Sequence, residues 1–188
     1  MENAVFPVEQ NNPDFNKNAI PVRMGIITAL VSIVTLTCVN LFLVHNLFAY
    51  GTGIVIALII NILLLGYTGK QQRKAMGGYI TIKEAFSAIF IAILILVGVG
   101  TVYSYIYLHF IDPDFAIKMK ETSLAFAERM GANQSALDEA AKKSDESIQK
   151  STSISTQMIS VAWGIVMYSI FGFICAAIVK KDRPQAMR

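Results

Sequence analysis

Three polar side chains lie inside long apolar segments, where a polar group is most informative about function. Asn61 and Thr35 lie near the middle of two successive apolar segments, and Asn40 lies closer to the end of the first. A polar group in lipid needs a hydrogen-bonding partner, either on a neighbouring helix or on a molecule in transit. We favour a bond between helices from Asn61 to Thr35 or Ser32. The alternative is a polar path lined by Asn61, Thr35 and Asn40.

The side chains that could perform acid–base, metal or thiol chemistry form no recognisable arrangement. His45 and His109 lie at the ends of apolar segments, and no spacing fixes them as ligands of one metal ion. Cys38 and Cys175 lie inside apolar segments, so we interpret them as packing residues. The sequence shows neither a nucleophile paired with a base nor a phosphate-binding glycine motif. We therefore expect no catalytic, cofactor-binding or metal site, and a protein that is not an enzyme.

Four apolar segments are long enough to cross a membrane, which takes about 20 helical residues. Hydrophobic residues make up 54% of the 188 residues and charged residues only 15%, whereas soluble domains contain about 25% charged residues. The four segments cover residues 24–44, 48–67, 85–107 and 156–179. Backbone polar groups in lipid must be bonded within the segment, so each should be a helix. The predicted fold class is all-α, an integral membrane four-helix bundle with an extracytoplasmic helical hairpin insertion.

The middle of these segments contains no Asp, Glu, Lys, Arg or Pro. Carriers driven by proton or sodium gradients usually need ionisable groups or broken helices near the membrane midplane. A coupled transporter is therefore not expected. The net charge of +3 is small and scattered along the chain, so nucleic acid is not an expected partner either.

Basic residues near the segment ends predict the orientation in the membrane. With four spans, the N-terminus, the loop of residues 68–84 and the C-terminus share one side. That side holds ten of the sixteen basic residues, namely Lys17, Arg23, Lys70, Arg73, Lys74, Lys83, Lys180, Lys181, Arg183 and Arg188. We therefore expect cytoplasmic tails at residues 1–21 and 181–188, which flank a membrane domain of residues 22–180. The predicted location is the cell inner (plasma) membrane, as a multi-pass protein.

Residues 112–155 form the only sizeable hydrophilic region and predict an outer helical hairpin. Asp112-Pro113 is typical of a helix start, and this first helix should run to Met130. Ser135 and Asp138 resemble a capping box at the start of a second helix. The second helix could continue into the fourth span without interruption.

One narrow stripe of the first hairpin helix is formed by Phe115, Met119, Phe126 and Met130. We favour packing of this stripe against the partner helix or the end of the bundle. The alternative is a docking face for another protein or for lipid, because Met-rich surfaces re-pack around varied partners.

Small residues recur in the spans at intervals that suit close helix packing. One face of the fourth span is formed by Ser160, Gly164, Gly172 and Ala176. Such faces let helix backbones approach closely. Packing within the chain is the favoured use, and a homo-oligomer is the alternative.

Two stretches flank the third span, GGYITIKEAF at residues 77–86 and YIYLHFIDPDF at residues 105–115. Within the first, Glu84 suits a helix N-terminus, and its contact with a cytoplasmic partner is a further hypothesis. Together with the four spans and the insertion, these stretches make residues 20–180 resemble an uncharacterised bacterial membrane family, domain of unknown function 4199, common in Bacteroidetes. The family often has Phe where this chain has Ile82. The resemblance implies a location in a Gram-negative inner membrane. It suggests no particular activity, because none is assigned to the family.

The leading interpretation of function is a non-enzymatic accessory or scaffold protein. It would lie in the lipid bilayer and act by association with a membrane protein partner or with copies of itself, with the outer hairpin as the contact region. The alternative is a small permeation or lipid-handling membrane protein.

Overall fold

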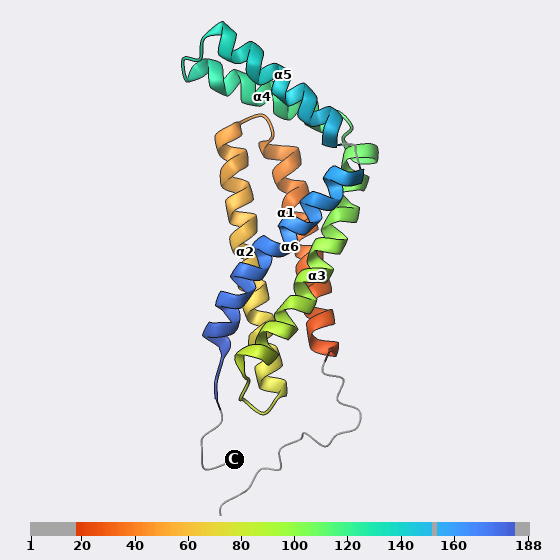
Figure 1. The fold of residues 1–188 in the computed structure, drawn as a ribbon, viewed down its shortest axis with the longest axis vertical. Helices are drawn as coiled ribbons and strands as arrows, with labels where there is room; N and C mark the ends of the chain where they lie inside the picture. Colours follow the sequence, from red (N-terminus) through yellow and green to blue (C-terminus); the bar gives the residue numbers. More distant parts are fainter. Residues whose placement is uncertain (1–17, 152–153, 183–188) are drawn as a thin grey trace, which may run out of the picture.

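The computed structural model describes residues 18–151 and 154–182, and almost all of them are helical (Figure 1). The helices are α1 (Ala19–Leu43), α2 (Leu47–Ala75), α3 (Ile82–Ile106), the π-helical turn η2 (Tyr107–Ile111), α4 (Phe115–Arg129), α5 (Gln134–Ser151) and α6 (Ile154–Val179). Four of these segments are long and apolar enough to span a membrane: α1, α2, α3 with η2, and α6. The expected all-α fold with four candidate spans is confirmed.

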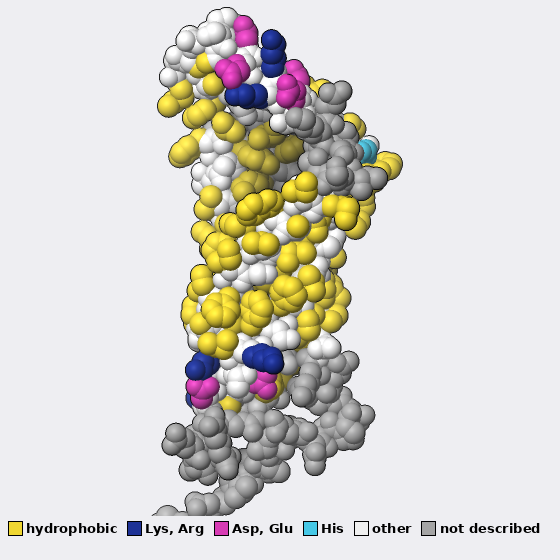
Figure 2. Space-filling model, in the orientation of Figure 1, with side chains coloured by type: hydrophobic (Ala, Val, Ile, Leu, Met, Phe, Trp, Pro, Cys, Tyr) yellow, Lys and Arg dark blue, Asp and Glu magenta, His cyan; other side chains and the backbone are white. Residues whose placement is uncertain are grey.

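The helix α2 is longer than the span predicted for it, because it continues past residue 67 to Ala75. Its 29 residues measure about 44 Å at 1.5 Å per residue, well beyond a hydrocarbon core of about 30 Å. The helix ends just before Gly77 and Gly78, whose φ angles of 79° and 89° suit glycine alone. The extra turns carry Arg73 and Lys74, so α2 extends a basic end out of the apolar zone. Figure 2 shows that zone as a broad hydrophobic band with charged side chains at either end.

The pair α2 and α3 forms the centre of the bundle, because each contacts the other and also both α1 and α6. A Cβ atom on Gly25 of α1 would lie only 3.0 Å from the Cα atom of Ala92 in α3. A Cβ atom on Gly172 of α6 would lie 2.8 Å from Ile93 Cδ1. Glycine therefore lets both outer helices approach α3 closely, and at Gly172 the small-residue face of the fourth span packs within the chain.

The buried core lies toward the end of the bundle where α1 begins and α6 ends, which we call the terminal end. It contains Leu65, Ile80, Ala85, Ile89, Ala92, Ile93, Cys175, Ala176 and Val179. The loop after α2 folds back on α6, because Ile80 and Lys181 exchange two backbone hydrogen bonds of 3.0 Å. Arg73 Nη1 also donates to the carbonyl oxygen of Val179 at 3.0 Å. These bonds close the terminal end of the bundle.

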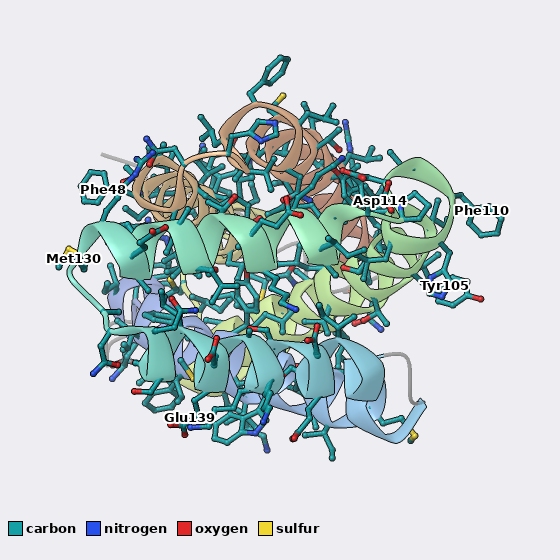
Figure 3. All side chains as sticks on the ribbon, turned by 90° about the horizontal axis from the view of Figure 1, so that it is seen from above. Phe48, Tyr105, Phe110, Asp114, Met130 and Glu139 are labelled. Carbon is teal, nitrogen blue, oxygen red and sulfur yellow. The ribbon has the colours of Figure 1, made fainter. Side chains whose placement is uncertain are left out.

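The helices α4 and α5 form a hairpin that lies across the opposite end of the bundle, which we call the hairpin end (Figure 1; Figure 3, from above). In both views α5 and α6 run in opposite directions across the bundle. A straight helix from Ser135 to Val179 is therefore wrong. The junction between α5 and α6 is at residues 152–153, which lie outside the described residues.

The first hairpin helix starts later than predicted, because α4 begins at Phe115 and not at Pro113. Asp112 instead follows η2, and its N–H donates to the carbonyl oxygen of Tyr107 at 2.8 Å. The Asp112 carboxylate accepts hydrogen bonds of 2.8 and 2.9 Å from Lys118 Nζ. Asp112 therefore joins the third span to α4 rather than capping α4.

The second hairpin helix is capped by Asn133, not by Ser135 as predicted. Asn133 Oδ1 accepts a 2.9 Å hydrogen bond from the N–H of Ala136, as an N-cap side chain does. Ser135 Oγ donates to the same Oδ1 at 2.9 Å, so Ser135 supports the cap. Asp138 accepts from the Gln134 side chain at 3.1 Å, which replaces the predicted capping box.

The close contact at Gly25 should make α1 intolerant of a side chain there. We expect Gly25→Val to lower the thermal unfolding midpoint in mild detergent, because Ala92 Cα belongs to the backbone and α3 would have to move. Overpacking of this kind costs about 1–3 kcal/mol. The control is Gly98→Val, because a Cβ there meets nothing within 4 Å. Equal unfolding midpoints for the two variants would contradict the contact.

Candidate functional site

Asn61 links two spans through its buried side-chain amide. Its Nδ2 donates to Ser32 Oγ of α1 at 3.3 Å. Among the described residues, no hydrogen-bond donor satisfies Asn61 Oδ1. The structure therefore contains one of the two expected pairings, the one with Ser32, and leaves one acceptor of the amide without a protein partner.

The other two residues of the predicted polar path have partners of their own. Thr35 Oγ1 donates to the carbonyl oxygen of Val31 in its own helix at 2.8 Å. Asn40 Oδ1 accepts from the Tyr50 hydroxyl of α2 at 3.4 Å. The structure therefore does not join Asn61, Thr35 and Asn40 into one hydrogen-bonded network.

A cluster of tyrosines fills the bundle at the hairpin end. The hydroxyl groups of Tyr103 and Thr37 are hydrogen-bonded at 2.8 Å and connect α3 to α1. Tyr107 packs against Tyr103, with ring centroids 5.7 Å apart, and is only 2% exposed. Among the described residues, the Tyr107 hydroxyl has no hydrogen-bond partner. A buried tyrosine hydroxyl usually has one, so this atom marks an unusual site.

From composition alone, Tyr103, Tyr105 and Tyr107 would be taken for an aromatic belt at the membrane surface. That interpretation is wrong for Tyr107, which is buried, whereas Tyr105 is exposed. The spacing of the tyrosines indicates the difference, because residues 103 and 107 are four apart and share one helix face, whereas residue 105 lies on another. The composition of the segment does not distinguish the buried tyrosine from the exposed one.

The hairpin is anchored to the bundle through the start of α4. Phe115 packs edge-to-face on Tyr107, with ring centroids 5.6 Å apart, and lies 6.3 Å from the Tyr50 ring. Two turns further along α4, Thr122 Oγ1 donates to the carbonyl oxygen of Val44 at 2.9 Å. These two contacts define the side of α4 that faces the bundle.

The predicted Phe/Met stripe is divided among three environments. Phe115 packs on the tyrosine cluster, and Met119 lines an open groove between α4 and α5. Phe126 is 40% exposed and Met130 is 74% exposed. The favoured packing interpretation therefore applies to the first half of the stripe, and the second half is uncovered in the described chain.

Glu84 caps α3 as part of a complete capping box with Thr81. Its carboxylate accepts from the N–H of Thr81 at 2.9 Å, and the N–H of Glu84 donates to Thr81 Oγ1 at 3.3 Å. This structural role accounts for the acidic residue at this position. A contact of the exposed Glu84 with a cytoplasmic partner stays a hypothesis. If cells with the Glu84→Gln variant had the same phenotype as cells with the wild-type protein, the hypothesis would be abandoned.

The tyrosine cluster allows a matched pair of substitutions. Tyr107→Phe should leave the free energy of unfolding unchanged or raise it, because it removes a buried hydroxyl that has no partner. Such a group costs about 1–3 kcal/mol. Tyr103→Phe should lower the stability, because it breaks the bond to Thr37. Equal losses in both variants, measured by thermal unfolding in detergent, would mean that Tyr107 has a bound partner.

Comparisons with known proteins agree with the family resemblance. The sequence model of the family described as "Protein of unknown function (DUF4199)" matches residues 23–181. Searches of the curated proteins and of the solved structures find no match. The matched region includes all four candidate spans except the first turn of α1, as well as the hairpin. The chain therefore belongs to the DUF4199 family, whose function is unknown.

Proposed function

We propose that this chain is a non-enzymatic accessory or scaffold protein of the cell inner membrane that associates with another membrane protein through the α4–α5 hairpin. The observation that supports the proposal is that the hairpin lacks a core. None of the 15 residues of α4 is buried, and the described side chains of α5 are half-buried or exposed. In proteins most of the stability of a helix comes from packing of its apolar face and not from helix propensity. A partner's surface would supply the burial that the hairpin lacks.

The groove between the two hairpin helices is the contact surface that we favour. It has a volume of about 410 Å³ and is lined by Met119 and Ser123 of α4 and by Ser144 and Ile148 of α5, among others. Ion pairs lie along it, with Lys120 Nζ 2.6 Å from Asp145 Oδ1 and Lys143 Nζ 2.7 Å from Glu139 Oε1. Apolar side chains between charged pairs suit an amphipathic segment of a partner protein.

In the proposed orientation the terminal end faces the cytoplasm and the hairpin lies outside. The support is the distribution of basic residues, since Lys70, Lys74 and Lys83 are all exposed at the terminal end. Cytoplasmic loops carry such an excess of Lys and Arg. The hairpin carries acidic and basic residues together, as a segment outside the membrane does.

Crosslinking on spheroplasts tests the partner and the orientation together. A membrane-impermeant amine crosslinker should join hairpin lysines to one protein that is recovered in near-equal amount. We expect Met119→Ser to reduce the recovery, because it removes the apolar side chain in the groove. The control is Ile117→Ser, because Ile117 is an exposed apolar residue of α4 outside this groove.

Two results would contradict the proposal, and they are distinguishable. Modification of the hairpin lysines only after permeabilisation would reverse the proposed orientation. Modified lysines without a recovered partner would contradict the proposed contact at the groove. So would equal recovery of the partner with the Met119→Ser and Ile117→Ser variants.

The second candidate function is permeation or lipid handling. The observation in its favour is Asn61 Oδ1, which is buried near the middle of the bundle and has no donor among the described residues. If it binds a passing polar solute, Asn61→Leu should abolish solute flux through the purified protein in vesicles. Absence of flux through the wild-type protein would end this candidate.

A further inference from the structure

The exposed half of the Phe/Met stripe consists of Phe126 and Met130. It continues, beyond the helices of the bundle, the side of α4 that faces the bundle. Phe115 and Thr122 define that side by their contacts with Tyr107 and Val44. Successive residues of a helix turn by about 100°, so Phe126 and Met130 lie within about 80° of the direction of Thr122. Phe126, at about 40°, therefore lies on the side of α4 that faces the bundle and the membrane, and Met130 lies between that side and the groove of Met119.

The surroundings of these two side chains are apolar and uncovered. Met130 and Phe48, which is 78% exposed at the start of α2, lie on the same side of the molecule in Figure 3. Phe110 of η2 is 75% exposed and lies on the opposite side in the same view. Large exposed apolar residues thus lie on both sides of the molecule. Lipid can cover both sides at once, whereas one contact with a second copy would cover only one.

The charges of α4 are arranged as in a helix at a membrane surface. Glu121 and Glu128 are seven residues apart, so they share one face, which lies about 160° from the centre of the stripe at 100° per residue. Arg129 lies about 70° from that centre by the same measure. The acidic groups are therefore turned away from the membrane, and a basic group borders the apolar face, where it can reach lipid phosphates.

We propose that α4 is an interfacial helix whose residues Phe126 and Met130 insert among the phospholipids of the leaflet on the hairpin side, beside Phe48. Interfacial helices bury their apolar face about 5–10 Å into the boundary between headgroups and acyl chains. The insertion fixes the hairpin across the bundle. This inference does not depend on the proposed partner protein.

Tryptophan fluorescence tests the insertion directly, because Trp163 is the only tryptophan of the chain. In a Trp163→Phe background, single tryptophans are placed by Phe126→Trp and by Met130→Trp. The control is Ile117→Trp, on the opposite face of α4 and also exposed. Each full-length variant is reconstituted at low protein density into vesicles of phosphatidylcholine and phosphatidylglycerol, with and without brominated acyl chains, and is titrated with iodide.

Tryptophans at positions 126 and 130 should show blue-shifted emission, should lose fluorescence to the brominated lipid, and should resist iodide. The tryptophan at position 117 should be quenched by iodide and not by the brominated lipid. Quenching of all three by iodide alone would overturn the proposal. So would shielding of positions 126 and 130 from both quenchers, which would indicate protein contact. Helical content by circular dichroism checks the fold, and Met130→Trp carries the test if Phe126→Trp does not fold.

Discussion

The close approach of α1 and α6 to α3 determines how the rest of the chain is arranged. In lipid every backbone polar group must be bonded within its helix, so helices associate through packing and not through exclusion of water. Gly25 against Ala92, and Gly172 against Ile93, bring the backbones together where large side chains could not fit. The core at the terminal end then forms from small and aliphatic residues such as Ala85 and Ala176.

The hairpin end is built from different residues and has different properties. Aromatic rings and single hydrogen bonds, such as those of Tyr103 and Asn40, connect the helices there. The hairpin rests on this end through Phe115, Thr122 and the Asp112–Lys118 ion pair, and ion pairs near the surface contribute about 0–1 kcal/mol. Elements with few buried contacts open most readily. The half of the chain with the weakest internal packing is therefore the half that we propose to meet a partner and the lipid surface.

The sequence predicted the elements well and their arrangement poorly, for physical reasons. The spans were evident because an apolar run of about 20 residues has few other structures available to it. The extension of α2 to Ala75 was missed, because hydropathy marks the apolar zone and not the end of the helix, which Gly77 and Gly78 determine. The inward position of Tyr107 is not visible in the composition, because an interfacial tyrosine and a buried one give the same signal there.

The candidate sites were predictable only as isolated positions. Asn61 was evident as a candidate because it is a polar residue near the middle of a predicted span. Its contact with Ser32 follows from the antiparallel packing of two successive spans. The division of the Phe/Met stripe was not predictable, because it depends on where α4 crosses the end of the bundle. That crossing arises from tertiary contacts at Val44 and Tyr107, far along the chain from Phe126.

Hydrogen–deuterium exchange of the protein in lipid nanodiscs tests the central claim, that the fold is held at the terminal end and only lightly at the hairpin. The comparison uses two helical segments that we place outside the hydrocarbon core, residues 70–75 of α2 and residues 136–148 of α5. We expect slow exchange in the first, because Arg73 and the buried Gln72 tie it to the core. We expect fast exchange in the second. Equal protection of both segments would contradict this expectation.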